Sequence, residues 1–301
     1  MASWLPPLIP GNRAGAYAGR ALLNTVTMIG YQHPRRSLVR RVDEPGAVRG
    51  EWVSGPARPG QRVLYYLHGS GYIGCSPATH RGLVAQLTSR TGRPAFVLRY
   101  RRGPEHRFPA AHQDAVAGFL WLLDQGFDPS DIVVAGDSAG GHLAVALCGE
   151  LRRRGIGQPA GLVLMSPLID PTYDVAAEYE SVSRDPFIRV GIARRLTGLY
   201  TVGADTTDPR LDVRRDVGAD LPPMLIQAGG REILRADAEQ YAAALRIAGG
   251  TCDLQIWRGQ MHVFQLCYRI LPEAREALDR IQQFITDLDA SASRPKRAST
   301  G

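Results

Sequence analysis

With 301 residues and 44% hydrophobic content, the chain is long enough to bury a core without cross-links, which excludes the small disulfide- or metal-stapled protein classes. Its net charge of +7 comes from arginines scattered singly and in twos and threes, with Lys296 as the only lysine, and this pattern favours no nucleic-acid partner. No apolar run approaches the roughly 20 residues that span a bilayer, so no integral membrane segment is expected.

Residues 1–10 contain no basic stretch followed by a long apolar one, so no secretory signal is predicted and a cytoplasmic location is expected. The cysteines form no CxxC pair, and in a reducing compartment they are expected to be free thiols. They are Cys75, Cys148, Cys252 and Cys267.

Strand-like runs alternate with helical stretches along most of the chain. The first two strands, 38–42 and 48–53, are joined by turn residues and are expected to pair antiparallel. Further strands are expected at 62–67, 95–100, 131–136, 161–165, 223–228 and 253–257. Helices are expected at 80–91, 110–125, 139–154, 236–248 and 272–288. This alternation predicts an α/β fold, with a mostly parallel central sheet and helices on both faces.

Two segments do not fit the alternation. Residues 1–35 precede the sheet, and residues 170–221 separate two strands by more than a normal connection, with helices expected at 174–183 and 186–200. We expect both segments to form a small helical cap on a domain that spans 36–289. The small, polar and basic residues 290–301 predict a disordered tail.

A nucleophile elbow is predicted where an apolar strand runs into an alanine-rich helix. The residues at this junction, which contain G-x-S-x-G, are Gly136-Asp137-Ser138-Ala139-Gly140-Gly141. The glycines two residues on either side of Ser138 leave room for the neighbouring strand and helix, and the serine hydroxyl is presented at a helix N-terminus. The alternative is that Ser138 is an ordinary helix N-cap.

Backbone donors for an oxyanion are expected in the loop His68-Gly69-Ser70-Gly71, which follows a buried strand. A tetrahedral intermediate carries a negative charge on one oxygen, and losing one preorganised N–H donor costs about 3–4 kcal/mol. We assign the donors to the backbone N–H groups of Ser70, Gly71 and Ala139. The alternative is an ordinary glycine turn at a strand end.

His262 is the predicted general base. In the α/β-hydrolase fold the triad follows the order serine, acid, histidine, and only His262 follows Ser138 at a distance. It lies in the loop after the strand 253–257. His142, four residues after Ser138, is expected to pack or hydrogen-bond locally. The remaining histidines precede the serine; they are His33, His68, His80, His106 and His112.

The acid is expected in the loop after the strand 223–228, which offers two carboxylates. Glu232 is nearer the strand end, where a triad assembles, so it is the favoured acid that orients the imidazole. Asp237 stands where a helix begins, and helix N-capping explains it.

Together these motifs resemble the hormone-sensitive-lipase family of esterases, also described as the bacterial acetyl-hydrolase and arylacetamide-deacetylase-like group. The resemblance covers about residues 60–285. The loop 68–71 is similar to the family's H-G-G-G, with Ser70 in place of the middle glycine, and 136–141 matches its G-D-S-A-G-G. Residues 100–114 resemble its Y-R-x-x-P-E-H-x-F-P-A-A-x-x-D stretch, which we interpret as scaffold. The acid and histidine loops are matched by Glu232-Ile233-Leu234, with Glu for the commoner Asp, and His262-Val263-Phe264.

The resemblance implies the α/β-hydrolase fold, no cofactor, and a cap that shapes the acyl and alcohol pockets. It implies hydrolysis of short- to medium-chain acyl esters through an acyl-enzyme intermediate. Two alternatives are carried: a deacetylase of an N-acetyl or aryl-amide metabolite, and a non-catalytic ligand receptor on the same fold. A receptor would be expected to lack a triad member. The expected partner is a small acyl ester, no metal is expected, and a homodimer is left open.

Overall fold

The computed structural model describes residues 17, 38–44, 48–183 and 185–292. The predicted N-terminal cap segment, 1–35, therefore lies outside the described residues except for Tyr17. His33 also lies outside them.

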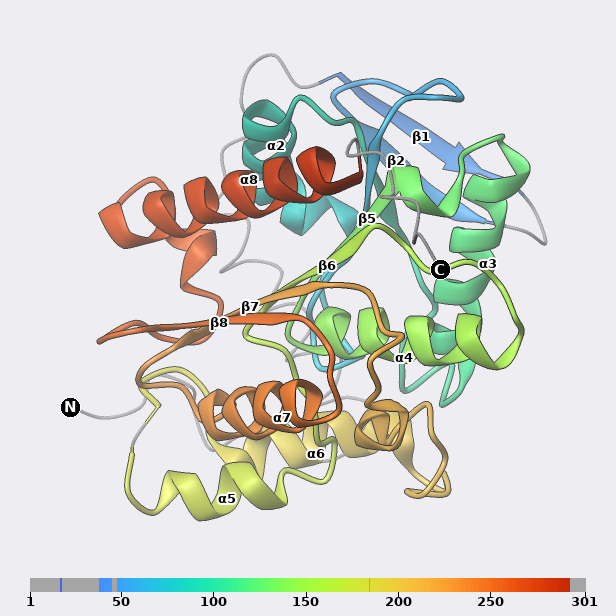
Figure 1. Ribbon diagram of the computed structural model, residues 1–301. Helices are drawn as coiled ribbons and strands as arrows, with labels where there is room; N and C mark the ends of the chain where they lie inside the picture. Colours follow the sequence, from blue (N-terminus) through green and yellow to red (C-terminus); the bar gives the residue numbers. More distant parts are fainter. Residues whose placement is uncertain (1–16, 18–37, 45–47, 184, 293–301) are drawn as a thin grey trace, which may run out of the picture.

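Eight strands form one sheet in the order β1-β2-β4-β3-β5-β6-β7-β8 (Figure 1). The strands are β1 (Val39–Asp43), β2 (Arg49–Val53), β3 (Val63–Leu67), β4 (Ala95–Leu98), β5 (Ile132–Asp137), β6 (Gly161–Met165), β7 (Met224–Gly229) and β8 (Cys252–Trp257). β1 pairs antiparallel with β2, and β2 with β4, whereas every other pair is parallel. The predicted mostly parallel sheet, with its antiparallel first pair, is confirmed.

Helices cover both faces of this sheet, as expected. They are α2 (Pro77–Thr91), α3 (Ala110–Asp124), α4 (Ala139–Arg153), α5 (Asp174–Glu180), α6 (Val190–Thr201), α7 (Arg235–Ile247) and α8 (Pro272–Ala292). α2 and α8 lie on one face, and α3, α4 and α7 on the other (Figure 1).

The two faces are separated by the pleat of the buried strands. In β5, Ile132 and Val134 pack with α3 and α4, whereas Val133 and Ala135 pack with α2 and α8. Successive side chains in a strand point to opposite faces, so a strand buried on both sides is a continuous apolar run. This is the pattern that made β5 recognisable in the sequence.

Parallel pairing brings the loops that follow five strands to one edge of the sheet. Leu67 at the end of β3 pairs with Gly136 near the end of β5, and Gly136 pairs with Leu164 of β6. Gly229 at the end of β7 pairs with Trp257 at the end of β8. The predicted oxyanion, serine, acid and histidine loops therefore all begin at this edge.

The insertion at 170–221 is helical in part, as expected, and its helices α5 and α6 lie beside α7 (Figure 1). α5 ends at Glu180, three residues before the predicted end, and a short 3-10 helix follows at Val213–Asp216. The buried residues of α6 recur at three- and four-residue spacing, so one face packs inward. They are Val190, Ala193, Thr197 and Tyr200.

The start of α2 and the end of α8 also differ from the predicted bounds. α2 begins at Pro77, three residues early, because Ser76 and Thr79 form a capping box ahead of it and proline fits the first helical position. α8 continues to Ala292, three residues into the predicted disordered tail.

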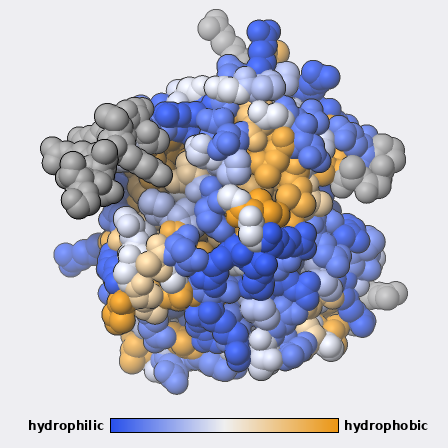
Figure 2. All heavy atoms as spheres, turned by 45° about the vertical axis from the view of Figure 1, so that its right-hand side comes forward, coloured by the Kyte–Doolittle hydropathy of each residue, from blue (hydrophilic) through white to orange (hydrophobic). Residues whose placement is uncertain are grey.

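All four cysteines are free, as expected. The side of the molecule turned forward in Figure 2 is largely hydrophilic, with apolar side chains gathered in a few areas. Among the residues that the structure describes, no helix combines the length and the apolar character that a membrane span requires.

Candidate active site

Ser138 occupies a sharp turn between β5 and α4. Its backbone has φ 52° and ψ −122°, a conformation that side-chain-bearing residues rarely adopt outside functional turns. A Cβ on Gly136 would lie 2.5 Å from the Gly140 carbonyl oxygen, and one on Gly140 would collide with the Leu67 carbonyl. The two glycines are therefore required by the close approach of β3, β5 and α4, as the motif predicted.

The Ser138 side chain does not cap its own helix. It stands at the N-cap position of α4 but makes no capping hydrogen bond. Its Oγ instead lies 3.0 Å from Nε2 of His262, 124 residues later in the chain. The alternative of an ordinary N-cap serine is thus wrong.

His262 lies in the loop between β8 and the 3-10 helix Phe264–Cys267. Its Nδ1 is 3.6 Å from Oε2 of Glu232, while Nε2 faces Ser138. Burial alone would lower the pKa of His262, but the nearby Glu232 carboxylate, with smaller effects of Asp185 and Asp137, outweighs burial and raises the pKa. The surroundings therefore favour the imidazolium form.

Glu232 lies in the loop after β7 and is completely buried. This loop is joined to the histidine loop by backbone hydrogen bonds, from Gly230 N to Trp257 O at 2.8 Å and from Arg231 N to Gln260 O at 3.0 Å. Gly229 permits this approach, since a Cβ there would lie 2.5 Å from Gln260 O. Glu232 and His262 are thus held relative to one another by backbone contacts between their loops.

The loop 68–71 is anchored to the elbow through Asp137. Asp137 Oδ1 accepts hydrogen bonds from Gly69 N at 2.9 Å and from the Tyr66 hydroxyl at 2.8 Å, and Oδ2 lies 3.3 Å from His80 Nε2. Burial tends to raise the pKa of Asp137, but His80 and these donors outweigh it and lower the pKa. A Cβ on Gly69 would collide with Asp137, so this position requires glycine.

The amide N–H groups of Ser70, Gly71 and Ala139 donate no hydrogen bond to any other residue that the structure describes. Ser70, Gly71 and Ser138 are partly exposed, whereas the residues that anchor them are buried. Gly71 has φ 57°, which glycine adopts without penalty. Ser70 needs no such conformation, and its hydroxyl is held 3.1 Å from the Tyr100 hydroxyl. Serine in place of the middle glycine therefore fits this loop.

Comparison with known proteins places this arrangement in a family. A family model described as alpha/beta hydrolase fold matches residues 64–266. The acetyl-hydrolase of Streptomyces hygroscopicus is 36% identical over 277 residues, which is 87% of this chain and 92% of that protein. An esterase of the bacterial hormone-sensitive lipase family has a solved structure with a TM-score of 0.84, 33% identity and 91% coverage of both chains. The chain belongs to the hormone-sensitive-lipase family of α/β hydrolases.

Two further proteins are similar to this α/β hydrolase. The carboxylesterase/phospholipase LipF of Mycobacterium tuberculosis is 34% identical over 241 residues, which is 77% of this chain and 64% of that protein. The structure of EstE5 soaked with p-nitrophenyl butyrate has a TM-score of 0.84 and 32% identity, and the match covers 93% of this chain and 94% of that one.

Asp237 has a different place in the hydrolase from the one expected. The N-cap of α7 is Leu234, so the predicted N-capping role of Asp237 is wrong. Asp237 is buried in the first helical turn, where its Oδ2 accepts a hydrogen bond from Asp170 N at 3.3 Å. Burial raises the pKa of Asp237 to about 7. The hydrogen bond between Asp170 and Asp237 connects α7 to the start of the insertion.

The remaining described histidines lie away from the Ser138 hydroxyl. His68 stacks on Tyr100 with ring centroids 4.3 Å apart, and His80 faces Asp137. His112 and His142 are buried. His142 packs in the core, as expected, and its ring also makes a distant contact, because Nε2 lies 2.9 Å from the carbonyl oxygen of Leu211, 69 residues away.

Two residues that the sequence analysis missed contact the acid and histidine loops. Ser166, directly after β6, has φ 48° and donates from its hydroxyl to Glu232 Oε2 at 2.7 Å. It also accepts from Val263 N at 2.9 Å. Asp185 of the insertion is buried and accepts from Ile233 N at 3.1 Å. Neither residue belongs to a motif, so the chain offers no local signal for them.

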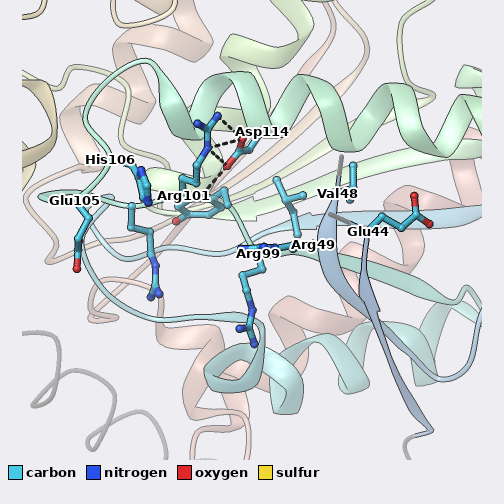
Figure 3. Close-up of a pocket in the computed structure, with 11 residues that line it drawn as sticks. Glu44, Val48, Arg49, Arg99, Arg101, Glu105, His106 and Asp114 are labelled. Atoms are coloured by element: carbon cyan, nitrogen blue, oxygen red, sulfur yellow. Dashed lines mark hydrogen bonds and ion pairs between the residues drawn. The ribbon is translucent and has the colours of Figure 1, made fainter. Parts of the chain in front are cut away.

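A cavity of about 520 Å³ opens beside the site, at the carboxyl end of β4 (Figure 3). Most of its lining residues are charged, and they include a pair in which Arg101 donates to both carboxylate oxygens of Asp114. Tyr100 belongs to the lining and also contacts Ser70, so it stands between the cavity and the oxyanion loop. None of Ser138, Glu232 and His262 lines it.

Proposed function

We propose that this protein is a serine carboxylesterase that cleaves short- to medium-chain acyl esters, with Ser138 as nucleophile, His262 as general base and Glu232 as the acid. The observation that carries the proposal is the 3.0 Å contact between Ser138 Oγ and His262 Nε2 on a strained strand-to-helix turn. An elbow of this kind presents a nucleophile at the edge of the sheet where the other loops converge.

Acylation begins when Ser138 Oγ attacks the ester carbonyl carbon and His262 Nε2 takes the hydroxyl proton. The carbonyl π electrons move to the oxygen, and the resulting oxyanion is stabilised by the backbone N–H groups of Ser70, Gly71 and Ala139. The tetrahedral species collapses, the bond to the alcohol oxygen breaks, and His262 returns the proton to the leaving alkoxide.

Deacylation repeats these steps with water. His262 removes a proton from water, the hydroxide adds to the acyl carbon, and the bond to Ser138 Oγ breaks as His262 reprotonates the serine. The carboxylic acid product leaves and the enzyme is restored. Glu232 stabilises the imidazolium that forms in each half-reaction, which agrees with its effect on the pKa of His262.

The substrate class is supported by the relatives. One is named acetyl-hydrolase and another carboxylesterase/phospholipase, and p-nitrophenyl butyrate was soaked into the structure of a third. A small acyl ester is the substrate chemistry that these names share. The aryl-amide deacetylase alternative uses the same triad, so it differs in the leaving group and not in the residues.

The test is turnover of p-nitrophenyl esters beside an aryl acetamide, together with labelling by a fluorophosphonate probe. We expect the esters to be the better substrates and Ser138 to carry the label. Ser138→Ala is expected to lose both turnover and label while keeping the fold, as seen by circular dichroism. Full labelling of that variant would place the nucleophile elsewhere, and preference for the acetamide would favour the deacetylase.

A homodimer and a cytoplasmic location stay predictions. Light scattering after gel filtration measures the first, and fractionation of the producing cell measures the second.

A further inference from the structure

Tyr72, which directly follows the oxyanion loop, is held in an unfavourable backbone conformation. Its φ is 65°, next to 57° for Gly71, and its side chain is fully buried. Only glycine adopts the left-handed region freely, and another residue there persists only where its surroundings fix it. The contacts of Tyr72 therefore bear on the shape of the loop that supplies Ser70 and Gly71.

The first such contact is a hydrogen bond to His142 of α4. The Tyr72 hydroxyl lies 2.7 Å from His142 Nδ1, and His142 Nε2 lies 2.9 Å from the carbonyl oxygen of Leu211. Burial lowers the pKa of His142 to about 4, so the ring is neutral at pH 7 and carries one proton. A carbonyl can only accept, so the proton is on Nε2, and Nδ1 accepts from the tyrosine hydroxyl.

The second contact is a ring stack with the insertion. Tyr72 lies parallel to Tyr200 of α6, with centroids 4.6 Å apart and an interplanar angle of 18°. The Tyr200 hydroxyl is fixed in turn by Ala111 N at 3.1 Å and by His112 Nδ1 at 3.0 Å. Leu211 and Tyr200 both belong to the insertion, so both contacts of Tyr72 lead to it.

His142 also belongs to the helix that begins at the elbow. It follows Ser138 by one helical turn, and its N–H donates to the Ser138 carbonyl at 3.2 Å. The same helix starts with Ala139, one of the proposed oxyanion donors. His142 therefore joins the two parts of the proposed oxyanion hole. Its backbone belongs to α4, and its ring accepts a hydrogen bond from Tyr72, the residue after Gly71.

We propose that His142 is a positioning residue that sets the separation of the oxyanion donors on loop 70–71 from the donor on α4. His142 contacts Leu211 and Tyr72 stacks on Tyr200, so this separation also depends on the position of the insertion. The inference rests on the proposed esterase function, because it assigns a role in stabilising the oxyanion of that reaction. It requires no contact between His142 and the substrate.

The test begins with Tyr72→Phe, which removes the hydroxyl and keeps the ring that stacks on Tyr200. Displacing an oxyanion donor weakens only the transition state, so we expect kcat to fall about 10- to 100-fold with KM changed less than about twofold. The inhibition constant of a trifluoromethyl ketone, which forms a tetrahedral adduct with the serine, should rise in step with the loss in kcat/KM.

Tyr65→Phe is the matched control. Tyr65 is also buried, and its hydroxyl donates to the Ala115 carbonyl at 2.9 Å, away from the reacting groups. Losing one such bond should lower Tm by about 2–4 °C in either variant. Only Tyr72→Phe should lose kcat. Equal kcat for the two folded variants, or unchanged ketone inhibition in Tyr72→Phe, overturns the proposal.

His142 itself is tested by two amide substitutions. The amide of His142→Asn reaches the place of Nδ1 and can accept from Tyr72, whereas that of His142→Gln reaches the place of Nε2 and can donate to Leu211. We expect Asn to retain more kcat than Gln, and the reverse order contradicts the assignment. If either variant fails to fold, the kinetics of Tyr72→Phe alone test the proposal. Failure of the esterase function itself would show in the wild type, which would then turn over no ester.

Discussion

The hydroxyl of Ser166 donates a 2.7 Å hydrogen bond to Oε2 of Glu232, the same carboxylate oxygen that faces Nδ1 of His262. Ser166 also accepts from the N–H of Val263, which follows His262 in the chain. One buried side chain directly after β6 thus fixes both the orientation of the Glu232 carboxylate and the position of the loop that carries His262. Glu232 Oε1 has no hydrogen-bond partner among the described residues, so Oε2 carries these contacts.

Ser166→Ala is expected to lower kcat about 10-fold with little change in KM. Without the hydroxyl the Glu232 carboxylate is free to rotate, so it holds the imidazole less well in the geometry that the proton transfers need. The lost buried hydrogen bonds should also cost about 1–3 kcal/mol of unfolding free energy. Steady-state kinetics and urea unfolding measure the two effects, and an unchanged kcat would mean that Ser166 only supports the fold.

Glu232→Ala is expected to abolish most activity, with kcat lower by roughly 10⁴-fold, because the proposed triad acid is lost. Asp237→Asn is the matched comparison: it keeps an oxygen for Asp170 N, and we expect near-normal kcat. Circular dichroism verifies that both variants fold. A dead, folded Asp237→Asn beside an active Glu232→Ala would reverse the assignment of the acid.

The pH profile of kcat/KM reports on His262. The base must be neutral, and its pKa lies above the ordinary value of 6.5, so the rate should fall as pH drops through an apparent pKa above 6.5. Glu232→Gln removes the negative charge that raises this pKa, so the acid limb should move to lower pH while the plateau falls. Rates from pH 5 to 9 test this. An acid limb at the same pH in both proteins would show that Glu232 does not act on His262.

The sequence was sufficient to predict the sheet and the elbow because each has a local signature. Strands buried on both faces are apolar runs, and the glycines around Ser138 reflect a close approach that no side chain permits. The order of serine, acid and histidine then selects His262 among the histidines. These predictions needed no knowledge of which distant residues meet.

Contacts between distant segments could not be predicted in this way. Ser166 meets Glu232 across 66 positions, and His142 meets Leu211 across 69, with no motif at either end. Asp237 was misinterpreted for the same reason: a carboxylate in the first turn of a helix normally stabilises that helix, whereas this one is buried against the start of the insertion.

Asp237 should make stability depend on pH. Its pKa is about 7 in the folded protein and near 3.8 when exposed, so between these values the folded state holds a proton that the unfolded state has released. Stability therefore falls as pH rises from about 4 to 7, by at most about 4 kcal/mol from this group. Asp237→Asn cannot titrate, so urea unfolding at pH 5, 6, 7 and 8 should show wild type losing stability relative to it. Parallel curves would refute the shift.

We expect the insertion to influence which acyl-chain lengths are accepted. The inward face of α6 is buried, and its outward face carries Arg194 and Arg195. The Arg194 guanidinium donates hydrogen bonds to the backbone carbonyls of Thr172 and Tyr173. Such a charged outer face offers little surface for a lipid interface. We therefore expect no jump in activity at a lipid surface, in keeping with the short- to medium-chain esters of the proposed function.

Esters of acetate, butyrate, hexanoate, octanoate and palmitate measure this expectation directly. Each methylene that the pocket buries contributes about 0.8 kcal/mol of binding free energy, so kcat/KM should rise roughly fourfold per added carbon until the acyl chain fills the pocket. Beyond its end the added carbons clash or stay in water, and kcat/KM should fall, with the maximum between acetyl and hexanoyl. The control is a titration of each ester across its solubility limit, where the rate should show no step. A maximum at palmitate, or a rate that jumps above the limit, would identify a lipase, because only an enzyme with a long apolar channel or a lipid-binding face gains from those conditions.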